Sequence, residues 1–469
     1  VPVLLAAAPI AIPPMHGSEW LPVLFALLMA CVTTLVFGLL PGWGVLLRAP
    51  VAMLQGGGQV GVSSHQVRMG NGLMIGQVAV AMVLLSAASL LLGTFLKLRS
   101  VPSGVEATHL MVAQVTLKGD AYASTLHTTQ FIDKVLAELG HYPGVERVAA
   151  VNGLPLDRGL NTGGSPADHP DAKHIVEFRT VTPGYFRTLG ISILSGRDVT
   201  MDDTANSVPV ALISETAARH WWPGQSAIGK EVLVGGKTPW RVVGVVADTH
   251  SHSLAESPRL VIYAPFAQAS DEMMKTINGW FPTTFALRLS GNVDVATAVQ
   301  KAVSDADPGI PVAKLATMQS VIDRSVAAPR FFSYLAGGFA GFSLLLTMIG
   351  LFGLMSYQVT QRTKEIGVRL AVGADRTQIL LLIVRRALWL TGVGVVLGTV
   401  ASLAVPRIVG SILSDVIYTG GRTVESLLAN SQAALVCAGI AMLVAAVLAS
   451  VLPARRAASI EPTEALRTE

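Results

Sequence analysis

The residues that could most readily perform chemistry lie in GQSAIGKE, Gly224–Glu231, which nearly fits the phosphate-binding loop G-x-x-x-x-G-K-[ST]. In that loop the last position offers a hydroxyl to magnesium, and a helix begins directly afterwards. Here Glu231 replaces the hydroxyl residue, and the following VLVGG has the pattern of a strand. The stretch is therefore not expected to bind a nucleotide. A second glycine cluster, LQGGGQ (Leu54–Gln59), has no nucleotide-binding domain around it and is interpreted as a flexible link.

Histidines are the second candidate for chemistry, as metal ligands. His250 and His252 alternate in DTHSHS, and His169 and His174 precede them. The sequence has no H-E-x-x-H pattern, and no cysteine accompanies these histidines. Alternate residues on a polar loop are more often solvated than metal-bound, so we expect no metal site. The segment LISETA also lacks the G-x-S-x-G elbow of serine hydrolases. We therefore predict no catalytic and no cofactor-binding residues, and the chain is not expected to be an enzyme.

The third candidate is QRTKEIGVRLAVGADRTQILLLIVRR, Gln361–Arg386. Its first part predicts a basic amphipathic helix that runs to about Leu370. Gly373 can adopt the left-handed conformation that ends helices. Asp375 with Gln378 three residues on resembles a capping box, which would start the next helix. Such a short, rigidly held helix is either a basic anchor at the membrane surface or a docking element for another protein.

The elements that must position this helix are apolar. Of 469 residues, 51% are hydrophobic and only 14% are charged, against about 25% charged in soluble domains. The two cysteines lie in apolar runs, so no disulfide framework is expected. Small residues recur within the apolar runs, as in LTGVGVVLGTVAS, and allow close helix packing in lipid. Five runs reach the roughly 20 residues needed to span a bilayer: Leu21–Leu40, Leu73–Leu96, Phe332–Tyr357, Ala387–Val405 and Ala433–Leu452.

The distribution of basic residues predicts which side each loop faces. Lys and Arg favour the cytoplasmic side of short loops. The connection after Tyr357 and the C-terminal tail are rich in arginine, whereas the loop 406–430 has two arginines offset by Asp415 and Glu425. The tail, the connection near residue 365 and residues 41–72 are therefore expected inside, and residues 97–330 outside. The net charge of +4 is modest and gathers beside apolar runs, so no nucleic-acid partner is expected.

Two similar segments lie some 400 residues apart. Leu40-Pro41 and Leu452-Pro453 each follow an apolar run, and a second proline comes nine residues later in both. We expect both proline pairs to end helices that run from outside to inside. The repeat suggests a duplicated membrane unit, with residues 1–54 as the end of the first copy. The opening VPVLLAAAPIAIPP is too short to span and is interpreted as the tail of a helix cut off upstream.

The outside segment has the pattern of a mixed α/β domain. HLMVAQVTL, TLHTTQFIDKVLAELG and VERVAAVNGL predict a strand, an amphipathic helix and a strand. TFALRLS, VDVATAVQKAVSDAD and IPVAKLAT repeat that order near the end of the segment. VPVALIS, EVLVGG and WRVVGVVAD predict short strands between them. We therefore expect one subdomain built from both ends of the segment and a strand-rich subdomain inserted at about 185–275.

Several segments resemble one protein family. RTKEIGVRLAVGA resembles the K-E-I-G-[IV]-R-x-A-x-G-A coupling-helix segment of MacB/FtsX-like ABC transporter permeases. VTPGYFRTLGISILSGRDVT, WPGQSAIGKEV, WRVVGVVADTH and PRLVIYAPF resemble, in order, the MacB-type extracytoplasmic core domain. QVAVAMVLLSAASLLLGTFLKL resembles the family's first spanning helix, and LPARRAASIEPTEALRTE resembles its C-terminal signature. Residues 1–69 resemble the end of a preceding permease half, as found in the subgroup of duplicated orphan permeases. Most of that first half is missing from this sequence.

The resemblance implies an α-helical membrane protein with an inserted mixed α/β extracytoplasmic domain. That domain would be a MacB-type periplasmic core, with a βαβ-repeat subdomain and a strand-rich inserted subdomain. The implied domains are residues 1–54 as the end of a preceding permease half (with the spanning helix 21–40), a cytoplasmic Gly-rich link 55–72, a spanning helix 73–98, the periplasmic core 99–330 and an FtsX-like permease domain 331–469. The last would hold spanning helices at about 332–357, 387–405 and 433–452 and a coupling helix at about 361–373.

The implied function is that of a permease subunit in the bacterial cytoplasmic (inner) membrane, crossing it several times. It would couple ATP hydrolysis by a separate cytoplasmic ABC ATPase dimer to movement of the periplasmic domain, for export or extrusion. The alternative is a non-transporting FtsX-like signalling permease that activates a periplasmic enzyme. No cofactor is expected in this chain, since ATP and Mg would be held by the ATPase. Further implied partners are the lipid bilayer, a second permease half or homologous copy, and a periplasmic adaptor or enzyme. The residues that match the family's ATPase-docking segment are Lys364, Glu365, Ile366, Gly367, Arg369, Gly373 and Ala374.

Overall fold

A computed structural model describes residues 64–405 except 158, 236, 237, 255 and 374, together with residues 24, 27, 28, 408 and 423–459. The expected span 21–40 and the first proline pair therefore lie outside the described residues, apart from three helical leucines (24, 27 and 28). The chain divides into two compact units. Of the described residues, one unit contains 64–85, 338–401 and 437–459, and the other contains 86–337, 402–405, 408 and 423–436. Each unit is described by itself.

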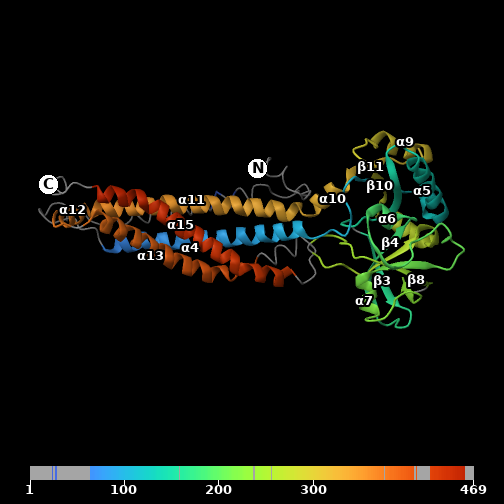
Figure 1. The fold of residues 1–469 in the computed structure, drawn as a ribbon, viewed down its shortest axis with the longest axis horizontal. Coiled ribbons are helices and arrows are strands. Elements are labelled where there is room, and N and C mark those ends of the chain that lie inside the picture. The colour runs from blue at the N-terminus through green and yellow to red at the C-terminus, as the bar shows by residue number, and fades with distance from the viewer. Residues whose placement is uncertain are drawn as a thin grey trace. The chain divides into compact units, whose positions relative to one another are not determined.

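The first unit is built from long apolar helices that run side by side (Figure 1). They belong to α4 (Ser64–Ser100), α11 (Ala327–Gln361), α13 (Arg376–Ser402) and α15 (Thr423–Ala458). Each of the four is long and apolar enough to cross a membrane. The link expected at 55–72 is wrong in its second part, because α4 already begins at Ser64. The sequence after Gly58 holds only isolated glycines, which a helix tolerates.

The expectation that Pro453 ends a helix is also wrong. Pro453 lies inside α15, which continues to Ala458. A proline removes one backbone hydrogen bond and kinks a helix, but helices in apolar surroundings can satisfy the freed carbonyl in other ways. The arginines behind Pro453 thus form the last turn of α15.

Glycines allow α13 to pack directly on α4. A Cβ at Gly394 would lie 2.6 Å from Cβ of Val78, and one at Gly398 would lie 2.6 Å from Cβ of Met82. The two glycines are four residues apart and so share one face of α13. This is the close approach of backbones that small residues permit between helices in lipid. The small residues of LTGVGVVLGTVAS therefore have the packing role that the sequence suggests.

A leucine at Gly398 should weaken this packing, because its side chain has no space against the α4 backbone. We expect Gly398→Leu to cost about 1–3 kcal/mol, as overpacking does in well-packed cores. The apparent melting temperature of the full chain in detergent should fall accordingly. Gly392→Leu is the matched control, since a Cβ there meets nothing within 4 Å. Equal melting temperatures for the two variants would contradict the contact.

The second unit contains an eleven-stranded sheet. One end of it consists of β11 (Val312–Thr317), β1 (Leu110–Val115), β10 (Thr283–Leu289) and β2 (Val145–Asn152), in that spatial order and all antiparallel. Helix α5 (Thr125–Gly140) connects β1 to β2, and α9 (Ala296–Ala306) connects β10 to β11. Two β-α-β units interleaved in this way form the ferredoxin-like arrangement. The two predicted strand–helix–strand repeats are these two units.

The remaining strands lie between β2 and β10 in the chain and form the other part of the sheet. They are β3 (Leu160–Pro166), β4 (His174–Val181), β5 (Ile193–Gly196), β6 (Val210–Ser214), β7 (Glu231–Val234), β8 (Thr238–Val246) and β9 (Val261–Pro265). A single residue pair, Val151 with Val181, joins β2 to β4. The inserted part thus begins at β3, earlier than the expected residue 185, because β3 and β4 pair with each other. Short helices complete the unit: α6 (Tyr185–Leu189), α7 (Glu215–Trp221), α8 (Asp271–Trp280) and α10 (Met318–Ser325), with 3-10 turns at Asp120–Ala123 and Phe266–Gln268.

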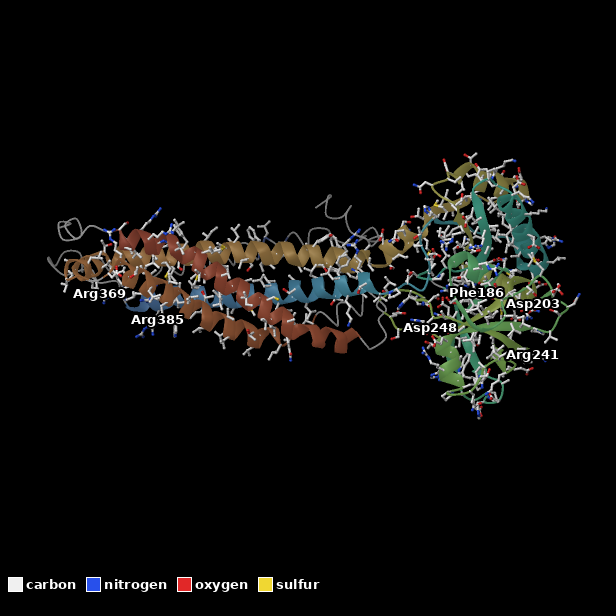
Figure 2. The ribbon with its side chains drawn as sticks, in the orientation of Figure 1. Phe186, Asp203, Arg241, Asp248, Arg369 and Arg385 are labelled. Atoms are coloured by element: carbon white, nitrogen blue, oxygen red, sulfur yellow. The ribbon has the colours of Figure 1, made fainter. Side chains whose placement is uncertain are left out.

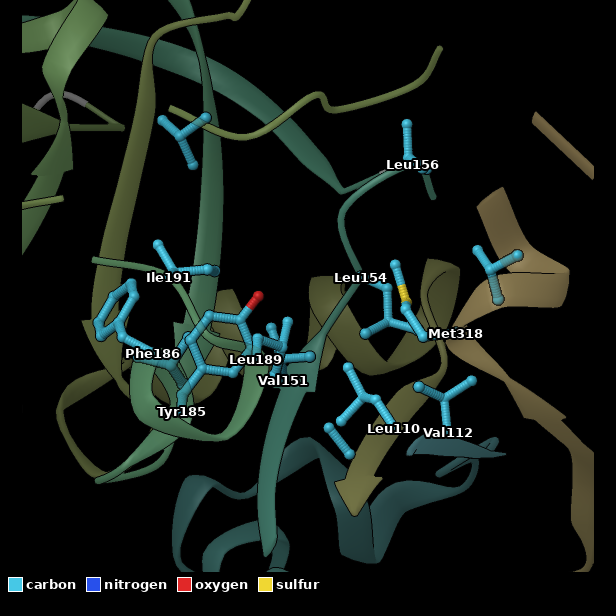
Figure 3. Close-up of a cluster of buried hydrophobic side chains, with 14 of the residues drawn as sticks. Leu110, Val112, Val151, Leu154, Leu156, Tyr185, Phe186, Leu189, Ile191 and Met318 are labelled. Carbon is cyan, nitrogen blue, oxygen red and sulfur yellow. The ribbon is translucent and has the colours of Figure 1, made fainter. Parts of the chain in front are cut away.

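One buried cluster links the two parts of the sheet. Figure 3 shows Leu110 of β1 and Met318 of α10 in the same cluster as Tyr185 and Phe186 of α6. The rings of Phe186 and Tyr263 meet edge to face, with centroids 5.1 Å apart. Because α6 contributes to a core that also holds β1 and β10 residues, the inserted strands and the ferredoxin-like strands are packed into one domain.

Candidate functional site

The candidate site is helix α12 (Thr363–Ala371), which is held at both ends by other helices. Only Arg362 separates it from α11, and the backbone N–H of Ile366 donates to the carbonyl of Arg362 at 2.9 Å. At its other end Gly373 has a φ of +99° and donates to the carbonyl of Leu370 at 3.1 Å. The predicted role of Gly373 in ending the helix is confirmed. Helix α12 therefore cannot move far without moving α11.

The start of α13 differs in detail from the capping box expected at Asp375 and Gln378. The Asp375 carboxylate accepts from the hydroxyl and, at 3.5 Å, from the backbone N–H of Thr377. Gln378 bonds to Asp375 only through its backbone N–H, which donates to the Asp375 carbonyl at 3.0 Å. Thr377 is closer to the cap than Gln378 and takes its place. Hydrogen bonds from the Thr377 hydroxyl, which has the larger effect, and from the Thr377 N–H hold the pKa of Asp375 below its ordinary value.

The two faces of α12 differ. Ile366 and Gly367 are buried, whereas Glu365 and Arg369 are exposed and form an ion pair with 2.7 Å between Arg369 Nη2 and Glu365 Oε1. Lys364 lies in the first turn of the helix. Figure 2 shows Arg369 at the same end of the helices as Arg385. Of the other residues expected to contribute, Gly373 forms the turn after the helix, and Ala374 lies outside the described residues.

The exposed face also carries two valines that the sequence analysis did not single out. Val368 is 48% exposed and Val372 is 84% exposed. They lie four residues apart and so on one side of the helix, next to Arg369. A single exposed apolar side chain is ordinary on a protein surface, but two neighbouring valines make a small apolar patch beside the charged pair, and such a patch can serve as a contact surface. The signal was available in the sequence as the i, i+4 spacing of two valines flanking an arginine.

The histidine loop is packed rather than solvated, so that expectation was wrong. His250 and His252 are both partly buried, and Nδ1 of His250 lies 2.9 Å from the carbonyl oxygen of Glu256. Burial lowers the pKa of both histidines. The loop contacts β4 and β9, and its alternating pattern did not reveal this because the contacts are remote in sequence. Within the described part of the chain no group of three or more His, Cys, Asp or Glu residues could hold a metal ion.

These histidines should make the domain less stable in mild acid. A histidine whose pKa is lower in the folded state stabilises the fold above its unfolded pKa of about 6.5, and that contribution is lost as the pH falls. We expect the apparent melting temperature of the wild type to fall between pH 7 and pH 5. His252→Gln should make the decline shallower, because the group that must be charged is gone. His141→Gln, at an exposed position, is the control and should leave the slope unchanged; a slope identical in all three proteins would exclude the effect.

Comparisons with known proteins identify the family. The family model described as "MacB-like periplasmic core domain" matches residues 72–305, and the one described as "FtsX-like permease C-terminal" matches residues 337–462. The chain belongs to the MacB/FtsX-like ABC transporter permeases. Together the two matches include α12 and most of both units, so the chain is a membrane protein with a periplasmic domain.

Individual relatives of this permease agree with that assignment. The macrolide export ATP-binding/permease protein MacB of Mannheimia succiniciproducens is 28% identical over 61% of this chain and 42% of its own length. The uncharacterized ABC transporter permease YvrN of Bacillus subtilis is 27% identical over 69% of this chain and 79% of its own length. The match thus spans less than half of that MacB protein. The crystal structure of the periplasmic region of MacB from Actinobacillus actinomycetemcomitans aligns with a TM-score of 0.32 and 17% identity over 48% of this chain and 95% of that one.

Proposed function

We propose that this permease works with a separate cytoplasmic ABC ATPase dimer, which docks on the exposed face of α12 and holds the ATP and Mg. The observation that carries the proposal is the surface of α12. It offers two exposed valines beside the Glu365–Arg369 pair at one end of the apolar helices. A partner can bury the valines and form ion pairs or hydrogen bonds with the charged residues. Protein interfaces commonly combine a buried apolar core with a polar rim in this way.

The docked ATPase would drive movement of the periplasmic domain. Helix α12 follows α11 after one residue, and α11 is unbroken over 35 residues. Displacement of α12 on nucleotide binding would therefore be passed along α11 rather than absorbed in a loop. Lys364, Ile366, Gly367, Gly373 and Ala374 would complete the docking segment, with the two buried residues fixing the helix on α11 and α13.

Export or extrusion on the periplasmic side is the activity that we favour. Relatives of this chain are named as macrolide and pyoverdine export proteins, which supports export over a purely signalling role. In this proposal the chain crosses the bacterial cytoplasmic (inner) membrane several times, with residues 99–330 in the periplasm. A second permease half or a homologous copy, and a periplasmic adaptor, would complete the transporter.

The test is to purify the tagged full chain from its native membrane and measure ATP hydrolysis in the preparation. We expect an ABC ATPase to co-purify and its hydrolysis to be stimulated by the permease. The identity of any periplasmic protein that co-purifies distinguishes export from signalling. An adaptor or outer-membrane channel supports export, whereas a cell-wall hydrolase would contradict export and favour signalling. A preparation with no ATPase in it would contradict the docking proposal.

A further inference from the structure

A basic pocket lies beside α12, between the end of α11 and the start of α13. Three arginines line it, one from each element: Arg362 after α11, Arg369 of α12 and Arg386 of α13. Glu365 is the one acidic residue of the lining, and it is paired with Arg369. Among the described residues, no carboxylate lies within ion-pair distance of Arg362 or Arg386. Among these described residues the pocket therefore carries more positive than negative charge.

The rest of the lining is apolar. The pocket wall is formed by residues of all three helices, among them Met355, Val359, Ile366, Ile379 and Ile383. Met355, Ile366, Ile379 and Ile383 are buried. A free hydrated anion gains nothing from such a wall, whereas a ligand with an anionic head and an apolar chain can satisfy both parts of the pocket. The chemistry therefore favours an amphiphile over inorganic phosphate.

The position of the pocket along α13 also points to lipid. Arg386 directly precedes the apolar run that begins at Ala387. Trp389, one turn further, is 64% exposed, and Leu381 and Leu382 on the other side of Arg386 are 65% and 47% exposed. Exposed leucines and a tryptophan next to arginines are typical of the boundary between acyl chains and headgroups. A pocket beside the start of this apolar run fits the level of phospholipid phosphates.

We propose that this pocket binds an anionic phospholipid, with its phosphate between Arg362 and Arg386 and the start of an acyl chain against the apolar wall. The bound lipid would contact Arg362, which connects α11 to α12, and would stabilise the position of α12. The inference goes beyond the docking of an ATPase and depends only on the pocket and on the membrane position of α13. It is therefore tested on the permease alone.

The experiment measures lipid binding to the purified full chain without an ATPase. Native mass spectrometry follows titration of delipidated protein with phosphatidylglycerol or with phosphatidylcholine of the same chain length. We expect phosphatidylglycerol to bind at least about tenfold more tightly. Arg362→Gln and Arg386→Gln should each reduce that preference about tenfold, as loss of a charged hydrogen bond does. Arg386→Lys keeps the charge and should retain most of the preference.

Arg385→Gln is the matched control, because Arg385 is the exposed neighbour of Arg386 and does not line the pocket. It should bind phosphatidylglycerol as the wild type does. An equal loss of preference in Arg385→Gln and Arg386→Gln would show that the arginines attract anionic lipid only through their general positive charge. That result would overturn the proposed lipid site. So would displacement of the lipid by inorganic phosphate at equal concentration, since the ligand would then be the free anion. Because the ATPase is absent, failure of the docking proposal would leave these results unchanged.

Discussion

Replacing Val372 by aspartate should reduce the permease-stimulated activity of a co-purified ATPase at least about tenfold. Val372 is 84% exposed, more than Val368 at 48%. If a partner buries it, an aspartate there places an unpaired charge in the interface, and a central contact of this kind is typically worth about 2 kcal/mol or more. The basal hydrolysis of the ATPase alone should not change, because the substitution lies in the permease.

Two further variants make this prediction specific. Arg369→Glu should also lower stimulation, because it reverses a charge on the same face and places two like charges at Glu365 and residue 369. Gln378→Asp introduces the same charge as Val372→Asp at an exposed position in the first turn of α13 and should leave stimulation unchanged. Stimulation equal to wild type in both Val372→Asp and Arg369→Glu would remove α12 as the docking element.

Replacing Arg179 by methionine should have the largest effect on stability. Glu177 and Arg179 lie on one face of β4, both fully buried, with 2.6 Å between Arg179 Nη2 and Glu177 Oε1. Burial alone would raise the pKa of Glu177, but the Arg179 guanidinium together with the Ser251 hydroxyl and His252 outweighs it and holds that pKa below its ordinary value. Removing one partner leaves a buried charge and costs about 3–5 kcal/mol. For a domain of this size that lowers the melting temperature by about 10 °C.

The double variant tests whether the lost pairing is the cause. Glu177→Gln combined with Arg179→Met removes both charges and should recover part of the loss, since replacing a whole buried pair is often nearly neutral. Arg219→Met removes a guanidinium that is 65% exposed from its ion pairs with Glu215 and Asp248, and because water screens such a charge it should change the melting temperature little. If Arg179→Met behaved like Arg219→Met in the same measurement, the account of the buried pair would be wrong.

Local patterns predicted the elements of this fold better than their arrangement. The period of apolar residues identified β1, α5, β2, β10, α9 and β11, because each has a strong pattern of its own. The spatial order of these strands depends on pairings between residues over 130 positions apart, such as Thr283 with Asn152 and Ala113 with Phe285. No local pattern contains that information. The extent of the insertion was misjudged because β3 contains two adjacent glycines and resembles a loop in the sequence.

The candidate site was partly predictable. The amphipathic helix to about Leu370 and the turn at Gly373 follow from residue type and spacing, and the structure has a helix and a left-handed glycine there. The docking role of its K-E-I-G residues was implied only by the family resemblance. The spacing of Val368 and Val372 shows in the sequence that they share one side of α12. That this side is exposed depends on how α12 packs on α11 and α13, which only the structure shows. The charged pair on β4 was missed because alternating polar residues in a strand usually face solvent, and here both strand faces are covered.

We propose that α12 and the α/β domain lie on opposite sides of the membrane, and labelling of single cysteines distinguishes the two sides. In a chain with both native cysteines replaced, Asp305→Cys marks the α/β domain and Arg369→Cys marks α12; both positions are exposed. A membrane-impermeant maleimide should label Asp305→Cys in intact cells and Arg369→Cys only after the inner membrane is opened. Labelling of both cysteines in intact cells, or of both only after opening, would contradict the account.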